Sequence, residues 1–492
     1  MKALKNYALI SCFDKSGLDQ LAPTLIEKGF ELLATGGSYE YLKKLSLPVT
    51  EVSEMTGKAE IFGGRVKTLQ YEILGGILLR QNQDEAEWPH DFRIGAVVCN
   101  FYPFQEKAKN ITEMKELVEW IDIGGPTMVR SSAKNYHHVY CLTHPKQYSW
   151  LKANPFENEL ELREQLALDA FDLIFDLDRR ISFELHSRLR KTLRYGENPH
   201  QKAVFLSHKN HETLGEISFN NLRDAEGALK FVAPFSGAAA CVVKHGTLCG
   251  AAASLVEDLD ACFEEAWEGD TVSRFGGIVA FNRTPTQAIL DTLSKKFVEV
   301  IVLPKNADSK AWAESFFKAR PKSKVFLYDK EQLAAWNLET FSSTLGTLIQ
   351  EKDQTKFQED QKSFEGLEKF FATWTAACSK SNAVTLVGNT EDKKLFFLAG
   401  AGQGQPNRVE CLEKLAIPRA QDFCKRRNYS MTSLICSSDA FFPFDDILHV
   451  MAKAEIKKVM QPGGSKNDPL VMETAKKLNI EISLTGERHF WH

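Results

Sequence analysis

The sequence lacks the features that define several large classes of protein. No apolar stretch approaches the length of a membrane span, and the apolar run at residues 8–13 is too short for the core of a signal peptide. No block of five or six like charges occurs, and 61 Lys and Arg residues are balanced by 65 Asp and Glu residues. We therefore expect neither a membrane nor a nucleic acid as a partner.

Paired cysteines are also missing. The chain contains 10 cysteines, but no two of them form a CxxC pair. This spacing fits neither a zinc ribbon nor a disulfide framework. We therefore expect no bound zinc and a location in the reducing cytoplasm.

Internal repeats and low-complexity segments are not visible either, so the domain count must come from length and pattern. The 492 residues are too many for one ordinary core, and about two to four domains are expected. Strand-like apolar runs alternate with amphipathic helical patterns, which predicts an α/β fold. A strongly helical segment at 159–190 predicts a boundary after it, between domains at 1–190 and 191–492. A polar, weakly patterned stretch at 341–365 predicts an exposed connection between two lobes, at about 191–340 and 366–492.

An apolar run that stops at Lys244 and His245 is the most informative local pattern. Residues 238–243 are small or β-branched, which predicts a buried strand, and open α/β sheets bind ligands at the carboxyl ends of their strands. An ammonium group beside an imidazole that titrates near neutrality suits proton transfer at a weakly nucleophilic amine. For a Lys-His pair alone, a solvated strand end is the alternative.

Glycines and cations follow the predicted strands of the amino-terminal part. Residues 30–34 predict a strand that runs into Thr35, Gly36 and Gly37 before a helix. Such a turn presents backbone N–H groups to an anion, although the glycines could serve the turn alone. Arg65 and Lys67 would share one side of the chain if their segment is extended.

Two further strand ends carry polar groups. Residues 93–104 predict a buried strand that ends near Asn100 and Tyr102. Farther along, Asp122 looks buried before a glycine turn, and Arg130 and Lys134 would project from one face of the following helix. A solvated helix face is the alternative for these two cations.

A dozen motifs in one order resemble the bifunctional purine biosynthesis family, which joins aminoimidazole carboxamide ribonucleotide (AICAR) formyltransferase to inosine monophosphate (IMP) cyclohydrolase. The resemblance spans almost the whole chain. It rests on TGGS, GGRVKTL, NFYPF, IDIGGPTMVR with SAKN, LRYGENPHQ, KH followed by CG, FGGIVAFNR, KSNAV, GAGQ with NRV, SDAFFPF, QPGGS and RHF.

The resemblance implies a fold and an activity for each domain. Residues 1–190 would be a methylglyoxal-synthase-like cyclohydrolase domain, and residues 191–492 a formyltransferase domain of two zinc-free, cytidine-deaminase-like lobes. The co-substrate would be 10-formyltetrahydrofolate, which formylates AICAR before dehydrative ring closure to IMP. A homodimer with formyltransferase sites across its interface is also implied, and a monovalent cation is left open.

For formyl transfer, the resemblance implies roles for three residues. His245 would be the base that takes the amine proton, Lys244 would stabilise the oxyanion and the departing folate nitrogen, and Asn382 would steady the histidine or the formyl oxygen. The implied contacts of the nucleotide phosphate are Arg194 and Tyr195, and those of its carboxamide are Phe441 and Arg488. The implied folate contacts are Phe275, Gly276, Arg408, Pro443, Phe444 and Asp446.

For ring closure, the implied residues fall on the clusters already described. The implied catalytic residues are Lys67, Tyr102, Asp122 and Lys134, with Asn100 as a substrate contact. The implied phosphate contacts are Ser11, Lys15, Thr35, Gly36, Gly37, Arg65 and Thr68.

Several motifs depart from the family pattern. The usual ANPCG after KH is GTLCG here, SAFGG is SRFGG with Arg274, and the segment after RVKTL lacks two histidines. Three interpretations therefore stand: a two-step enzyme, a formyltransferase with impaired cyclohydrolase, and a non-catalytic nucleotide or folate sensor. The intact Lys244 and His245 favour an enzyme, because a sensor needs no proton-transfer pair.

Overall fold

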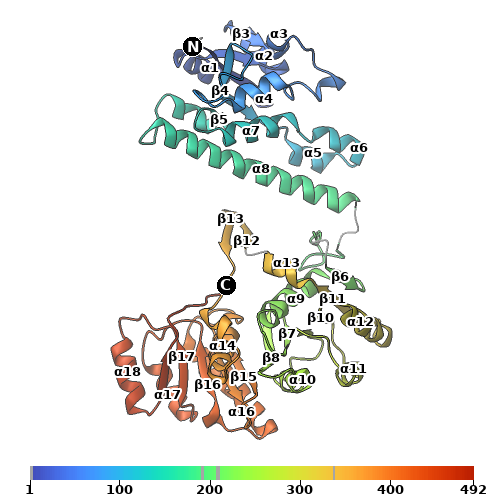
Figure 1. The fold of residues 1–492 in the computed structure, drawn as a ribbon, viewed down its shortest axis with the longest axis vertical. Helices are drawn as coiled ribbons and strands as arrows, with labels where there is room; N and C mark the ends of the chain where they lie inside the picture. Colours follow the sequence, from blue (N-terminus) through green and yellow to red (C-terminus); the bar gives the residue numbers. More distant parts are fainter. Residues whose placement is uncertain (1–3, 190–192, 207–210, 336–337) are drawn as a thin grey trace. The chain divides into compact units, whose positions relative to one another are not determined.

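The computed structural model describes residues 4–189, 193–206, 211–335 and 338–492. The chain divides into two compact units, Met1–Lys191 and Thr192–His492. Each unit has its own central sheet with helices packed on it (Figure 1). Strands and helices alternate along both units, which confirms the predicted α/β class.

The first unit is built on a parallel sheet of five strands in the order β3-β2-β1-β4-β5. From β1 the chain runs to β2 and β3 on one side of the sheet, and then returns to β4 and β5 on the other side of β1. α/β sheets bind ligands at the carboxyl ends of their strands near such a reversal of strand order. The strands are β1 (Lys5–Cys12), β2 (Glu31–Ala34), β3 (Val49–Glu51), β4 (Phe92–Asn100) and β5 (Tyr140–Leu142).

Helices cover both faces of this sheet because successive strand residues point to opposite sides. Leu9 of β1 packs with Met128 and Ala170, whereas its neighbour Ile10 packs with Leu21 and Leu42. The segments predicted as strands at 30–34 and 93–104 contain β2 and most of β4. The helices are α1 (Leu18–Glu27), α2 (Gly36–Lys44), α3 (Val52–Thr56), α4 (Tyr71–Leu78), α5 (Phe104–Asn110), α6 (Met114–Leu117), α7 (Gly124–Lys134) and α8 (Glu159–Leu189).

The second unit contains a mixed sheet of eleven strands in the order β18-β17-β16-β14-β15-β8-β7-β9-β10-β11-β6. Its strands are β6 (Glu212–Leu214), β7 (Ala239–Lys244), β8 (Thr247–Ser254), β9 (Ile278–Phe281), β10 (Val300–Pro304), β11 (Lys324–Tyr328), β14 (Val384–Asn389), β15 (Leu395–Gly402), β16 (Ile435–Ser438), β17 (Lys458–Gln461) and β18 (Glu481–Leu484). Its helices are α9 (Phe219–Val232), α10 (Leu259–Trp267), α11 (Gln287–Leu293), α12 (Ala307–Ala319), α13 (Lys330–Ala335), α14 (Phe364–Ala377), α15 (Arg408–Glu410), α16 (Ile417–Arg427), α17 (Asp446–Lys453) and α18 (Asp468–Lys477).

This sheet consists of two halves with the same strand order. Each half begins with an antiparallel hairpin, β7–β8 in one and β14–β15 in the other. The first strand of each hairpin also pairs antiparallel with the next strand along the chain, β9 or β16. That strand in turn pairs parallel with β10 or β17. Antiparallel pairing of β8 with β15 joins the halves. β7 is therefore antiparallel to both its neighbours, so Lys244 ends a hairpin strand and not one strand of a parallel set as expected.

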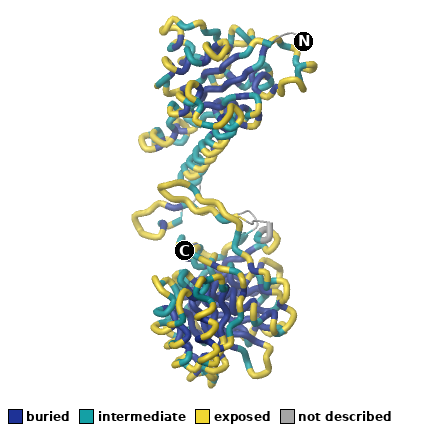
Figure 2. The backbone as a smooth tube through the Cα atoms, turned by 90° about the vertical axis from the view of Figure 1, so that its left-hand side faces the viewer, coloured by how far each residue is buried: buried dark blue, intermediate teal, exposed yellow. Residues whose placement is uncertain are grey.

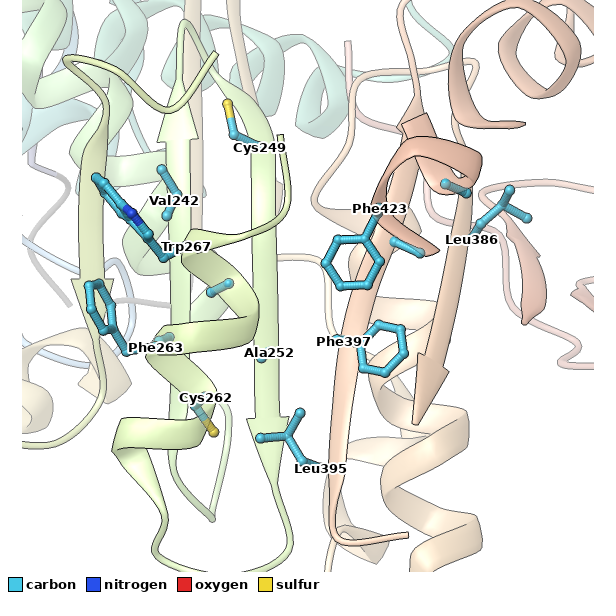
Figure 3. Close-up of a cluster of buried hydrophobic side chains, with 14 of the residues drawn as sticks. Val242, Cys249, Ala252, Cys262, Phe263, Trp267, Leu386, Leu395, Phe397 and Phe423 are labelled. Carbon is cyan, nitrogen blue, oxygen red and sulfur yellow. The ribbon is translucent and has the colours of Figure 1, made fainter. Parts of the chain in front are cut away.

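Apolar side chains from both halves share one core. Trp267 and Phe263 of α10 lie against β7 and β8, and Phe423 of α16 lies against Phe397 of β15 (Figure 3). The strands of both units are largely buried while loops and outer helix faces are exposed (Figure 2). The central strands are thus covered on both faces, which leaves their ends and turns to carry chemistry.

The polar stretch at 341–365 is more regular than predicted. It contains most of an antiparallel hairpin, β12 (Leu338–Ser343) and β13 (Gly346–Glu351), and the start of α14. Its side chains are mostly exposed, so the alternation that would mark a half-buried strand is absent from the sequence.

Candidate functional site

The carboxyl edge of the first sheet brings together several of the predicted phosphate and substrate contacts. Ser11, near the end of β1, and Thr35, after β2, share a hydrogen bond of 3.0 Å between their hydroxyl oxygens. The Asn100 side chain at the end of β4 accepts hydrogen bonds from the backbone N–H groups of Phe13 (2.7 Å) and Asp14 (2.9 Å). Asn100 therefore fixes the loop after β1, which carries Lys15.

Two ammonium groups lie at the start of α2. A Cβ atom placed on Gly36 would be 3.0 Å from Lys67 Nζ, and one placed on Gly37 would be 3.4 Å from Lys15 Nζ. The start of a helix already carries partial positive charge, and its first N–H groups have no partners inside the helix. Glu60 offsets part of this charge through a 2.8 Å ion pair with Lys67. The remaining positive field and free donors suit a phosphate group.

Asp122 lies beside this edge, before α7. Its carboxylate accepts a hydrogen bond of 2.9 Å from the Gly125 backbone N–H, and burial raises its pKa above the usual value. The Thr68 hydroxyl approaches the same turn, since a Cβ atom on Gly124 would lie 3.0 Å from Thr68 Oγ1. A carboxyl group with a raised pKa next to a candidate anion site is a candidate proton-transfer group.

Other predicted residues of this unit have different surroundings. The segment that carries Arg65 is not extended: Arg65 has helical backbone angles after a short 3₁₀ turn, and its guanidinium pairs with Glu119. The extended segment that would place Arg65 and Lys67 on one side is therefore not present at Arg65, because the Gly63-Gly64 pair turns the chain.

Tyr102 and Lys134 are exposed at the surface of the unit. The Tyr102 ring meets the Phe13 ring edge to face, with 5.8 Å between centroids. Lys134 closes α7, and Arg130 one turn earlier pairs with Asp178 of α8 at 3.0 Å. Arg130 thus ties α7 to α8.

In the second unit, Lys244 ends β7 and His245 begins the two-residue hairpin turn that follows. Lys244 pairs with Thr247, and His245 and Gly246 between them have φ angles of 53° and 69°. Two positive φ angles are typical of a type I′ turn, which Gly246 adopts without the steric cost that a side chain brings. The departure from the family motif at Gly246 therefore fits a tight, defined turn.

Asp224 holds this turn in place from α9. Its two carboxylate oxygens accept hydrogen bonds from the backbone N–H groups of His245 (2.9 Å) and Gly246 (2.8 Å). The Lys244 ammonium donates to the backbone carbonyl of Phe275 at 2.7 Å. The Lys-His pair is thus fixed by its backbone, while the His245 imidazole is exposed.

His245 lies on the wall of a cavity of about 930 Å³. The cavity is bounded by α9, by the segment at 193–206, by β12 and by the carboxyl-terminal residues Trp491 and His492. Lys230 and Lys380 add positive charge to the same wall. A cavity of this volume is in the range that holds a small organic ligand.

A second polar cluster surrounds Asn382. The Asn382 amide donates to the backbone carbonyls of Gln405 and Pro406, both at 2.9 Å. Next to it, the buried Asp439 carboxylate accepts a hydrogen bond from the Ser381 hydroxyl (2.7 Å) and forms an ion pair with Arg408 (2.9 Å). Asn382 and Arg408 therefore belong to one network, but neither lines the cavity that contains His245.

The remaining predicted contacts of the second unit are mostly exposed. Phe275 packs against Phe297 at 5.4 Å, Arg194 lies over the Tyr195 ring at 5.5 Å, and Arg488 lies over Phe490 at 4.5 Å. Gly276 follows Phe275 with a positive φ of 70°. The other members precede or begin α17: Phe441, Pro443, Phe444 and Asp446. None of these contacts lines the His245 cavity.

Sequence reasoning missed Asp224, Asp439, Lys230 and Lys380. Asp224 and Lys230 lie on α9. The sequence of this helix does not distinguish a polar residue that holds a neighbouring turn from one that only faces solvent. Asp439 is fully buried and lies two positions before the apolar FFPF segment, which is the one local signal that could have marked it.

The described residues contain neither a candidate metal cluster nor a candidate membrane-spanning helix. In the described ranges no three His, Cys, Asp or Glu side chains are placed to hold a metal ion. All ten cysteines are free and buried. No helix within the part of the chain that the structure describes is long and apolar enough to cross a membrane.

The first unit is a parallel α/β sheet with a candidate anion site at its carboxyl edge. The second unit carries a separate polar site at the hairpin of Lys244 and His245. A methylglyoxal-synthase-like (MGS-like) domain matches residues 17–127, and the family described as AICARFT/IMPCHase bienzyme matches residues 132–419. The chain belongs to the AICARFT/IMPCHase bienzyme family. This confirms the resemblance inferred from the motifs.

Relatives match the chain from end to end. The bifunctional purine biosynthesis protein PurH of Fusobacterium nucleatum is 36% identical over 524 residues, which cover 99% of this chain and 100% of the relative. PurH of Aquifex aeolicus is 35% identical over 99% of this chain and 100% of its own. Among solved structures, ForH aligns with 37% of this chain and 96% of its own at 30% identity, with a TM-score of 0.31.

Proposed function

We propose that this chain catalyses the last two steps of IMP synthesis, formyl transfer to AICAR and dehydrative ring closure. The observation that carries the proposal is the end-to-end match to bifunctional relatives at 35–36% identity, together with a distinct polar site in each unit. The first unit supplies an anion site beside Asp122, and the second supplies a fixed Lys-His turn at a cavity. We assign ring closure to residues 1–190 and formyl transfer to residues 191–492.

Formyl transfer needs a base for a poor nucleophile, since the 5-amino lone pair of AICAR is delocalised into the imidazole. As the amine nitrogen bonds to the formyl carbon of 10-formyltetrahydrofolate, His245 takes its proton. The bond from the formyl carbon to folate N10 then breaks, and N10 receives a proton to give tetrahydrofolate. Lys244 stabilises the tetrahedral oxyanion, for which it must exchange its present hydrogen bond to the Phe275 carbonyl.

The proposed nucleotide and folate contacts are those that the family motifs imply. Arg194, Tyr195, Phe441 and Arg488 would contact the nucleotide. Asn382 would steady the transferring formyl group. The folate contacts would be Phe275, Gly276, Arg408, Pro443, Phe444 and Asp446.

Ring closure joins the carboxamide nitrogen to the formyl carbon and then expels water. Holding both groups of one molecule close together supplies much of the rate. The nucleotide phosphate would bind at the start of α2 between Lys15 and Lys67. Asp122, whose pKa is raised by burial, would exchange the protons, with Tyr102 and Lys134 as further candidates.

We also propose that the chain forms a homodimer. Exposed residues outside the His245 cavity, such as Phe275 and Phe444, would complete a folate site against a second copy. Sedimentation of the purified protein measures this directly, and a monomer that is fully active at nanomolar concentration contradicts it.

One assay separates the three interpretations. The full-length protein is incubated with AICAR and 10-formyltetrahydrofolate, and separately with formylated AICAR, while IMP is measured. A two-step enzyme forms IMP in both incubations. A formyltransferase alone accumulates formylated AICAR in the first, and a sensor forms no product in either.

The Lys-His turn is tested by two substitutions. Lys244→Ala and His245→Ala should each lower formyl transfer at least about a hundredfold, the scale of a lost proton-transfer or oxyanion group. Ring closure of formylated AICAR should survive in both variants because it uses the other unit. Formyl transfer at the wild-type rate in both variants would show that the pair is only a solvated turn.

A further inference from the structure

A second cavity, of about 310 Å³, lies at the opposite edge of the first sheet. Its wall includes Arg93, the second residue of β4, and Tyr140, the first residue of β5. The catalytic edge of the same sheet contains Asn100, the last residue of β4. Asn100 is seven positions beyond Arg93 along the strand, which corresponds to about 23 Å at about 3.3 Å per residue. The cavity is therefore distinct from the proposed ring-closure site.

The charge of this wall is strongly one-sided. Lys28, Arg93 and Arg163 are permanent cations, His137 and His138 add two imidazoles, and the lining residues include no carboxylate. The nearby Glu159 offsets part of this charge, since it pairs with Lys28 at 3.1 Å and accepts a hydrogen bond from the Tyr140 hydroxyl at 2.5 Å.

The Arg163 guanidinium is incompletely satisfied. Arg163 lies over the Tyr140 ring at 5.1 Å, and its Nε is buried with no hydrogen-bond partner in the described part of the chain. Burial lowers the pKa of Arg93 and Arg163 lowers it further, while Glu85 opposes the shift in part. Burial, His137 and both arginines likewise lower the pKa of His138, and Asp84 opposes this shift in part. Each of these groups would be stabilised by an anion in the cavity.

We propose that this cavity binds the phosphate groups of a compact ligand. Guanidinium groups present paired N–H donors that match phosphate oxygens, and buried donors without partners are costly unless a ligand satisfies them. The volume equals that of about ten water molecules at about 30 Å³ each. Pyrophosphate, or the phosphate end of a nucleotide, fits this space and this charge.

Binding is tested on the full-length chain with the two other proposed phosphate sites disabled. In a Lys67→Ala, Arg194→Ala background, calorimetric titration with pyrophosphate should detect one site per chain. Adding Arg93→Gln, or independently Arg163→Gln, should weaken this binding at least tenfold. Arg130→Gln is the matched control, because Arg130 is an exposed arginine paired with Asp178, and it should leave binding unchanged.

The outcomes separate the possible ligands. AMP and ADP titrated in the same background show whether a nucleoside raises or lowers the affinity relative to pyrophosphate. Circular dichroism confirms that each variant is folded, and the two arginine variants test the site independently. If the background binds no pyrophosphate, or if both arginine variants still bind it at full affinity, the cavity is not a phosphate site.

Discussion

At the scale of single residues, Asp224 is the group whose removal is most informative. It holds the backbone of His245 and Gly246 with two hydrogen bonds but has no proposed contact with the reacting atoms. It is therefore a positioning residue. Loss of the clamp should disturb the geometry of formyl transfer and leave the acid–base properties of the imidazole in place.

Asp224→Ala should lower kcat for formyl transfer by at least about tenfold, since small displacements of catalytic groups are costly. Ring closure should be unaffected. Asp392→Ala is the matched control, because Asp392 similarly supports the β14–β15 turn through Thr390 and the Lys394 backbone. Steady-state kinetics should show a lower kcat for Asp224→Ala. The pH profile of the rate should keep the shape that it has in the wild type. Equal losses in both variants would mean that the effect is only one of stability.

Asp122 gives a prediction in which activity and stability change in different directions. Its pKa is raised by burial, so the folded state binds this proton more tightly than the unfolded chain. The folded state is therefore favoured at low pH, and this advantage is lost as the pH rises through the raised pKa. At neutral pH the buried carboxylate is a cost to stability.

Asp122→Asn should lower ring closure at least about a hundredfold while leaving the thermal midpoint unchanged or higher at pH 8. The asparagine oxygen can still accept the hydrogen bond from the Gly125 N–H. The stability of the variant minus that of the wild type should increase as the pH is raised from 4 to 8. A variant that is active, or one that is less stable at pH 8, would contradict the assignment.

At the scale of secondary-structure elements, the start of α2 links backbone conformation to function. Gly36 has a φ of +43°, and a Cβ atom there would lie 3.0 Å from Lys67 Nζ. Gly57 at the end of α3 has a φ of +67° with open space around it. The two glycines therefore share the backbone requirement but differ in their neighbours.

Gly36→Ala and Gly57→Ala should each cost about 1 kcal/mol of stability, because alanine rarely adopts a positive φ. Only Gly36→Ala should raise KM for the formylated nucleotide, since its methyl group displaces the Lys67 ammonium. Thermal unfolding and ring-closure kinetics measure the two effects. If both variants have the same KM, Lys67 does not bind the phosphate at this helix end.

The sequence was informative where a signal was local. Residues 238–243 and 30–34 are apolar runs bounded by turn formers, and they form β7 and β2. The resemblance covered the chain, and the family match confirms it. Contacts between distant residues carried no local signal. Asp224 reaches a turn 21 residues away, and the cavity at the amino edge gathers residues from Lys28 to Arg163.

At Arg65 a local signal was present but the structure differs from it. Its spacing from Lys67 was right for two cations on one side of a strand, but the glycines before it allow a turn that sends its guanidinium to Glu119. The deviation follows from Gly63, whose φ is 64°. Period-two arguments hold only where the backbone is extended.

At the scale of the whole molecule, the first unit has hydrophobic clusters of its own. Side chains on both faces of its sheet pack against its own helices, α1, α2, α4, α7 and α8. The candidate ring-closure residues all lie before residue 191. The unit therefore satisfies the usual requirements for independent folding.

A fragment of residues 1–191 should fold and should cyclise formylated AICAR at a rate within a few-fold of the full chain. It should not transfer formyl groups. Circular dichroism and the ring-closure assay measure both properties. A folded fragment without ring closure, when the full chain has it, would mean that the second unit completes the site.

The repeated strand order in the second unit has an evolutionary consequence. Two halves with one topology, joined edge to edge by β8 and β15, are the pattern that duplication of an ancestral half would leave. The copies have since diverged at the equivalent hairpin. One has a two-residue turn with His245, and the other has a longer turn supported by Asp392. Duplication would thus leave two equivalent hairpins, each free to change its turn without loss of the shared sheet.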